Sequence, residues 1–170
     1  MKTIYLVRHA KSSWKNPNLR DFDRPLNKRG KRDAPFMGMK LKERGLMPDA
    51  IISSPAARAK KTAQTIAEKL GFPWGEIEYL ERVYDADEED LLDIIRHQSN
   101  KAQTIMLFGH NPEFTWLSNE LSKSYIENIP TTGMVRIDFE VDRWKEIAYG
   151  KGKLIFFDYP KNYLDELPPK

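Results

Sequence analysis

Apolar residues in the first two-thirds of the chain follow two alternating patterns. Short apolar or β-branched runs, which are typical of buried strands, occur at residues 3–7, 50–53, 76–80 and 104–108. Apolar residues spaced three and four apart, which are typical of helices, occur at residues 28–44, 54–70 and 88–98 and again after Pro112. Later runs predict three more strands, at residues 134–141, 146–149 and 154–159.

This alternation of strands and helices predicts an α/β fold. Strands joined by helices form a mostly parallel central sheet with helices on both faces, so we expect a three-layer sandwich. A chain of 170 residues fits one domain. We place that domain at residues 1–160 and expect a loose, Pro-containing C-terminal tail at residues 161–170.

Two of the helices are expected to begin directly after strands. Ser54 and Pro55 have the residue types of an N-cap and a first helical position, which places Arg58 in or near the first turn. Pro112 is likewise expected at the first position of the helix that follows residues 104–108. The free N–H groups at such helix ends attract anions.

Composition narrows the chemistry that these elements can carry. The net charge of +3 favours anionic substrates without requiring nucleic acid. The chain has no cysteine, which excludes disulfides, thiolate metal sites and a cysteine nucleophile. No apolar stretch is long enough for a signal peptide or a membrane span, so we expect a cytoplasmic protein that does not bind membranes.

Arginine and histidine residues collect at one predicted edge of the sheet. Arg8 and His9 follow the first strand. Arg58 lies at a helix start, and His110 follows the strand at residues 104–108. The carboxyl ends of parallel strands meet at one edge of a sheet, where ligands bind. Because an arginine binds two phosphoryl oxygens at once, these residues predict a phosphoryl pocket.

His9 is the candidate nucleophile of this pocket. Phosphoryl transfer needs a nucleophile, positive charge around the phosphoryl oxygens and a proton for the leaving group. A neutral imidazole can attack phosphorus if one ring nitrogen carries no proton. We expect a backbone carbonyl in the turn after the first strand to hold the N–H of the other ring nitrogen of His9.

Several segments resemble the histidine phosphatase superfamily. The segment Leu6-Val7-Arg8-His9-Ala10 is similar to the family's Arg-His-Gly signature, with alanine in place of glycine. The other matching segments follow in order within residues 3–135 and are Arg24-Pro25-Leu26-Asn27-Lys28-Arg29-Gly30, Ser53-Ser54-Pro55-Ala56-Ala57-Arg58-Ala59 with Thr62-Ala63, Leu80-Glu81, and Gly109-His110-Asn111-Pro112. The short chain and its Arg-Pro-Leu segment resemble the compact SixA-type phosphohistidine phosphatases.

The resemblance implies a phosphoglycerate-mutase-like fold and a phosphatase that needs no metal ion or other cofactor. It implies that His9 forms a phosphohistidine intermediate. It also implies a phosphate pocket made of Arg8, Arg58 and His110. Glu81 matches the position where many members keep the acid that protonates the leaving group.

Two further pocket candidates lie in the loop after the nucleophile. In the family this loop contacts the substrate and the phosphate, so Ser12 and Trp14 are expected at the pocket wall. Lysine-rich stretches at residues 28–32 and 58–61 are interpreted as solvated helix faces and not as a nucleic-acid surface.

The sequence leaves three functions open. The first is hydrolysis of a phosphohistidine on a partner protein, where imidazole is a good leaving group and an acid is less necessary. The second is hydrolysis of a small phosphorylated metabolite such as a sugar phosphate, for which Glu81 should point into the pocket. The third is a non-catalytic module that binds phosphate or nucleic acid.

Overall fold

Six strands form one sheet in the order β3-β2-β4-β1-β5-β6. The computed structural model describes all residues from 1 to 170. The strands are β1 (Lys2–Arg8), β2 (Ala50–Ser53), β3 (Glu78–Tyr79), β4 (Thr104–Gly109), β5 (Met134–Phe139) and β6 (Lys153–Asp158). The pairs among β1, β2, β3 and β4 are parallel, and β5 pairs antiparallel with β1 and β6. The prediction of a mostly parallel sheet is confirmed.

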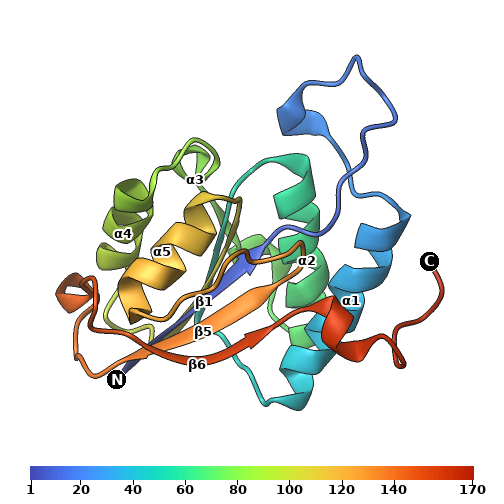
Figure 1. Ribbon diagram of the computed structural model, residues 1–170. Coiled ribbons are helices and arrows are strands. Elements are labelled where there is room, and N and C mark those ends of the chain that lie inside the picture. The colour runs from blue at the N-terminus through green and yellow to red at the C-terminus, as the bar shows by residue number, and fades with distance from the viewer.

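Helices cover both faces of the sheet, which gives the predicted three layers (Figure 1). On one face lie α1 (Lys28–Glu43) and α2 (Ala57–Leu70), which pack against each other. On the other face lie α4 (Glu88–Arg96) and α5 (Glu113–Ser122). The short α3 (Glu81–Tyr84) connects β3 to α4.

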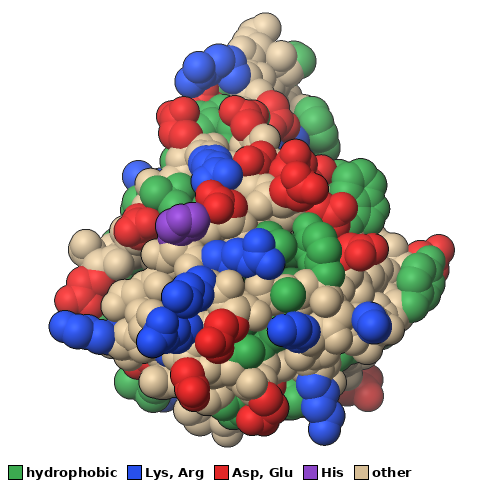
Figure 2. Space-filling model, turned by 90° about the vertical axis from the view of Figure 1, so that its left-hand side faces the viewer, with side chains coloured by type: hydrophobic (Ala, Val, Ile, Leu, Met, Phe, Trp, Pro, Cys, Tyr) green, Lys and Arg blue, Asp and Glu red, His purple; other side chains and the backbone are tan.

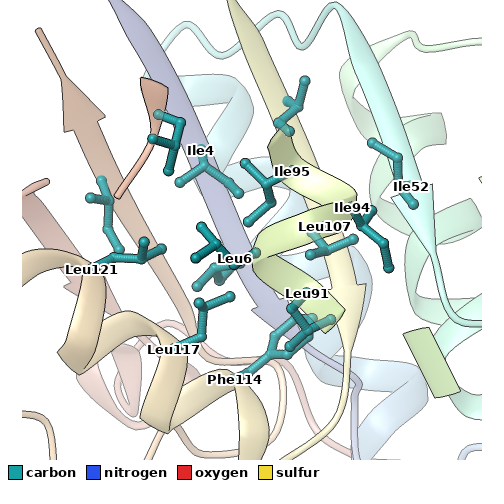
Figure 3. Close-up of a cluster of buried hydrophobic side chains, with 14 of the residues drawn as sticks. Ile4, Leu6, Ile52, Leu91, Ile94, Ile95, Leu107, Phe114, Leu117 and Leu121 are labelled. Carbon is teal, nitrogen blue, oxygen red and sulfur yellow. The ribbon is translucent and has the colours of Figure 1, made fainter. Parts of the chain in front are cut away.

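The central strands are buried on both faces. In β1, Ile4 and Leu6 belong to the core beneath α4 and α5, whereas Tyr5 and Val7 belong to the core beneath α1 and α2. Successive side chains of a strand point to opposite faces, so the middle of a strand that is covered on both sides, here residues 4–7, forms a continuous apolar run. Figure 3 shows the first core, in which β1 and β4 meet α4 and α5 through Ile4, Leu6, Leu107, Leu91, Ile95 and Leu117.

Two helices begin later than the sequence predicts. α2 starts at Ala57, because the Ser54 hydroxyl accepts a hydrogen bond from the Ala56 N–H (3.1 Å) in a turn before the helix. Pro112 stands at the N-cap of α5 and not at its first helical position. Both helices still begin just after the carboxyl ends of β2 and β4, so their N-termini lie at the edge of the sheet that the sequence predicts.

The strand predicted at residues 146–149 is wrong. Glu146 is the last residue of the short 3-10 helix Trp144–Glu146, and residues 147–149 after it form no strand. The Trp144 indole N–H donates to the Ala102 carbonyl (2.9 Å), and both Trp144 and Ile147 are buried. The apolar residues of this stretch therefore close one end of the core instead of extending the sheet.

The C-terminal segment, expected to be loose, is tied to the domain as far as residue 166. The Tyr163 hydroxyl donates to the buried carboxylate of Asp158 (2.5 Å), and Lys40 of α1 pairs with Glu166 (2.8 Å). Figure 1 shows this segment running beside α1. Side chains of the tail thus border the amino-terminal half of the domain.

None of the helices combines the length and hydrophobicity that crossing a bilayer would need.

Candidate active site

His9 lies directly after β1, at the carboxyl edge of the sheet, and its backbone is held on two sides. Its N–H donates to the Gly109 carbonyl (3.0 Å), and its carbonyl accepts from the Thr132 N–H (3.1 Å). The His9 Nδ1 atom lies 2.7 Å from the Ala10 carbonyl oxygen. Because a carbonyl can only accept, Nδ1 carries the proton and Nε2 keeps a free lone pair.

The His9 ring is neutral at physiological pH. Its side chain is 8% exposed, and this burial lowers the pKa of His9 to about 3. The hydrogen bond to Ala10 opposes the shift, while the nearby His110, Arg58 and Arg8 add to it. The arrangement predicted from the sequence, a neutral imidazole held by a backbone carbonyl, is the one that the structure shows.

Arg58 lies in the first turn of α2 and faces this lone pair. Its Nε atom is 3.4 Å from His9 Nε2, so the Nε–H points toward the nucleophile. Its two terminal nitrogens donate to Asp21, one to the backbone carbonyl (2.8 Å) and the other to the carboxylate (3.0 Å). The guanidinium is buried, which strengthens its interaction with any anion that enters.

His110 completes the cluster from the end of β4. Its ring centre lies 5.3 Å from that of His9, and its Nε2 is 2.8 Å from the Ser54 hydroxyl oxygen. The Ser54 hydroxyl has no other acceptor within hydrogen-bond distance, so we assign its hydrogen to the bond with His110, which places the imidazole proton on Nδ1. Burial, with a smaller contribution from Arg58, lowers the pKa of His110 to about 3.

Two buried donors of the cluster have no partner. One is His110 Nδ1 and the other is Arg8 Nε. A terminal nitrogen of Arg8 donates to the Ile129 carbonyl (2.9 Å), and burial together with Arg58 and Arg29 lowers the pKa of Arg8. Buried donors without partners are costly in a folded protein unless a ligand satisfies them. Here they belong to residues that lie close to His9 and lower its pKa, and donors gathered in this way can bind a phosphoryl group.

Asp21 belongs to the site although the sequence did not indicate it. Its carboxylate accepts hydrogen bonds from Arg58 (3.0 Å), Arg24 (2.8 Å) and the Tyr84 hydroxyl (2.8 Å). Partial burial would raise the pKa of Asp21, but these three hydrogen bonds outweigh it and lower the pKa to about 2. The Tyr84 ring in turn lies edge-on to the ring of His110, 5.5 Å away. Through these contacts, Asp21 holds the loop after His9 next to Arg58 and His110.

Ser12 and Trp14 lie beside the cluster and not inside it. The Ser12 hydroxyl is buried and accepts a hydrogen bond from Arg24. The Arg24 guanidinium also lies over the Trp14 ring, 3.3 Å from its centre, and the other parts of Trp14 are exposed. Both residues line a surface depression next to the first turn of α1. They reach Arg58 only through Arg24 and Asp21.

Glu81 is not brought to the cluster. It is exposed at the start of α3 and makes no side-chain hydrogen bond or ion pair. It lines a depression on another part of the surface, together with Asp93 and His97 of α4 and its C-terminal end. Figure 2 shows the side of the molecule that carries α3 and α4, where acidic and basic side chains are intermixed. The structure brings together Arg8, His9, Arg58 and His110 of the predicted site residues.

Comparison with known proteins agrees with this geometry. The sequence profile of the histidine phosphatase superfamily (branch 1) matches residues 4–93, more than half of the chain. The chain belongs to this superfamily. A chloroplast protein of Arabidopsis thaliana is 30% identical over 153 residues, which are 85% of this chain and 70% of that protein.

Solved histidine phosphatases share the fold. A structure assigned as the phosphohistidine phosphatase SixA of Agrobacterium tumefaciens is 31% identical, with a TM-score of 0.79 over 94% of this chain and 98% of that one. The protein histidine phosphatase SixA in complex with tungstate has a TM-score of 0.81 over the same shares of the two chains, but at 19% identity it supports the fold alone. The phosphoglycerate-mutase-like fold of the superfamily is confirmed, and membership supports phosphatase activity.

The low pKa of both buried histidines predicts a loss of stability in acid. The unfolded chain takes up a proton at each histidine near pH 6.5, while the folded protein resists protonation until about pH 3. The stabilisation that comes from keeping these two histidines neutral is therefore fully present above pH 6.5, and it is lost as the pH falls toward 3. The loss is about 1.4 kcal/mol per pH unit for each histidine.

Histidine NMR spectra of the His97→Gln variant test this prediction, because only His9 and His110 remain. We expect neither imidazole to titrate between pH 5 and pH 8, and the free energy of unfolding to be lower at pH 5 than at pH 7. An imidazole signal that titrates near pH 6.5 in this variant would contradict the neutral, buried pair.

Proposed function

We propose that this protein is a phosphatase that hydrolyses phosphohistidine on a partner protein, with His9 as the nucleophile and with no metal ion. One observation carries the proposal. The lone pair of His9 Nε2 faces Arg58 at 3.4 Å, and the two residues that carry buried nitrogens without partners, Arg8 and His110, lie close enough to lower the pKa of His9. The similarity to SixA over almost the whole chain supports the choice of substrate.

The proposed reaction has two steps. In the first, the Nε2 lone pair of His9 forms a bond to phosphorus while the P–N bond of the substrate breaks, and the departing imidazole keeps the electron pair and takes up a proton from water. Arg8, Arg58 and His110 donate hydrogen bonds to the phosphoryl oxygens. In the second, a water oxygen bonds to phosphorus, the P–Nε2 bond breaks, and phosphate and a proton are released.

The position of Glu81 supports phosphohistidine over a phosphate ester. An alkoxide leaving group needs an acid, and a side chain in that role contributes roughly 10²–10⁴-fold to the rate. Glu81 is exposed, and its carboxylate forms no hydrogen bond or ion pair with any residue of the cluster. An imidazole leaving group makes fewer demands, because it departs at neutral pH with a proton from solvent.

Assays with two substrates test the proposed function. A peptide phosphorylated on histidine and a sugar phosphate are compared at equal concentration, with phosphate release as the measurement. We expect kcat/KM to be higher for the phosphohistidine peptide. Faster hydrolysis of the sugar phosphate would instead make the protein a phosphomonoesterase that acts on small metabolites.

Replacing Glu81 with glutamine tests the role of this residue directly. We expect kcat/KM for the phosphohistidine peptide to change by less than about threefold, because a missing leaving-group acid would cost on the order of 10²-fold. Glu78→Gln is the matched control, since Glu78 is exposed and borders the same depression. A loss of 10²-fold in Glu81→Gln alone would restore Glu81 as the acid.

A further inference from the structure

Two neighbouring depressions beside the active site are lined by cations. One lies between the loop after His9 and the first turns of α1, and the other lies between α1, residues 128–131 and the C-terminal segment. Both are bordered by Arg29 and Lys170. We call the cations that line them the basic surface: Lys11, Lys15, Lys28, Arg29, Lys31, Arg32, Lys161 and Lys170.

The positive charge of the protein is concentrated on this surface. The only acidic side chain among the lining residues is Asp33, which is buried and pairs with Arg32 (2.8 Å) and Arg29 (3.6 Å). Setting these eight cations and one acid aside from the chain's 28 Lys and Arg and 25 Asp and Glu leaves 20 basic and 24 acidic residues. The rest of the molecule is therefore net acidic, so the basic surface is a local feature and not the average charge.

These cations are not placed where they stabilise α1. A helix N-terminus is the positive end of the helix dipole, so cations there destabilise the helix. The first turn of α1 has no acidic residue, and four cations lie within residues 28–32. α4 shows the stabilising arrangement, with acidic residues at Glu88, Glu89 and Asp90. Arg29 and Arg32 pair with Asp33, but Lys28 and Lys31 form no ion pair, so the charges of these two lysines point to a ligand and not to helix stability.

The basic surface is connected to the nucleophile. Gly30 of α1 lies against the loop, where a Cβ atom would stand only 2.2 Å from the Lys11 carbonyl oxygen. This contact sets the cationic first turn of α1 beside the segment that leaves His9. Arg29 also donates to the Thr131 hydroxyl (3.1 Å), and the next residue, Thr132, donates its N–H to the His9 carbonyl. An anion bound here lies next to the phosphoryl pocket.

Apolar side chains share the surface with the cations. Trp14 is 72% exposed and lines the first depression, and Leu164 is 69% exposed and lines the second. Exposed apolar groups among charges are typical of protein contacts. Binding of single-stranded nucleic acid would call for several free aromatic faces for base stacking, whereas the Trp14 ring is partly covered by Arg24.

We propose that the basic surface docks an acidic, partly apolar face of the protein that carries the phosphohistidine. This proposal rests on the proposed function, because the phosphorylated histidine must then enter the pocket of His9. The charge complementarity speeds encounter and orients the partner, while the phosphoryl group is bound by Arg8, Arg58 and His110.

Two histidine peptides test the docking proposal, one with glutamates and one with glutamines on both sides of the histidine. With both phosphorylated, the wild-type protein is expected to give a kcat/KM about tenfold or more higher for the glutamate peptide at low salt. This ratio should fall toward one at high salt. In the double variant Lys28→Glu/Lys31→Glu the ratio should fall below one.

The control variant is Lys101→Glu/Lys145→Glu. It makes the same change in charge on exposed residues near the opposite edge of the sheet, before β4 and in the 3-10 helix Trp144–Glu146. It is expected to keep the wild-type ratio. Equal kcat/KM for the two peptides in the wild-type protein, or equal ratios in the two double variants, would overturn the docking surface.

Binding of the unphosphorylated peptides, followed by fluorescence anisotropy, separates this proposal from the proposed function. Tighter binding of the glutamate peptide to the wild-type protein, lost in Lys28→Glu/Lys31→Glu, supports docking even if no phosphohistidine is hydrolysed. Hydrolysis of both phosphopeptides without such binding overturns docking and leaves the proposed function standing. A single-stranded oligonucleotide that binds more tightly than the glutamate peptide, and loses its binding in the same variant, would overturn an acidic protein as the occupant.

Discussion

Replacing His9 with alanine is expected to lower kcat for phosphohistidine hydrolysis by at least about 10⁴-fold, because the substitution removes the atom that forms the bond to phosphorus. The remaining pocket still holds Arg8, Arg58 and His110, so the phosphate should still bind. Loss of turnover with retained binding distinguishes a nucleophile from a binding residue.

The phosphoenzyme gives a second, direct measurement. The protein is mixed briefly with a labelled phosphodonor and denatured at alkaline pH, and acid-labile label is located by mass spectrometry. We expect it on His9 in the wild-type protein and not in His9→Ala. His97→Ala is the matched control, since it removes the exposed third histidine. Equal labelling of wild type and His9→Ala would refute the proposed mechanism.

Arg58 is expected to show the second largest effect. We expect Arg58→Ala to lower kcat/KM by about 10³-fold or more, since the guanidinium faces the attacking nitrogen from a buried position. Arg58→Lys keeps a positive charge but loses the planar fork, so most of the loss should remain. Arg82→Lys is a control for the same chemical change at an exposed arginine that pairs with Asp90 and Asp93.

The Asp21→Asn variant separates two effects of the Arg58 substitutions. Asp21 neutralises Arg58 but does not face His9 Nε2 in the way that Arg58 does. If Arg58 acts on the phosphoryl group, inhibition by inorganic phosphate should weaken in Arg58→Ala and persist in Asp21→Asn. Equal loss of phosphate inhibition in both variants would show that Arg58 mainly holds the loop.

The pocket could be predicted from the sequence because each of its four residues stands at a position that the backbone pattern defines. Arg8 and His9 end a strand, Arg58 opens a helix after the next strand, and His110 follows the strongest apolar run. Because the carboxyl ends of parallel strands meet at one edge of the sheet, these positions can be predicted to lie together even when the side-chain contacts are not known. The helix that carries Arg58 begins two residues later than the sequence predicts, but Arg58 still lies at the predicted edge of the sheet.

Asp21 could not be predicted in the same way. It lies in a loop with no periodicity, and its partners Arg58 and Tyr84 are far from it in the sequence. Such a contact depends on how the loop folds back over the sheet edge. Glu81 shows a second limit of prediction from sequence. A motif identifies which residue stands at a position, but it does not give the direction of the side chain.

The inverted charge of α1 has a consequence for protein engineering. Acidic residues in a first helical turn are among the commonest stabilising substitutions, so a screen for heat resistance alone should favour glutamate at positions 28 and 31. Such variants would gain stability while losing the cations that attract an acidic partner. Stability and substrate capture are thus opposed at the same positions, and thermostable variants selected without an activity assay should be slow on phosphoproteins.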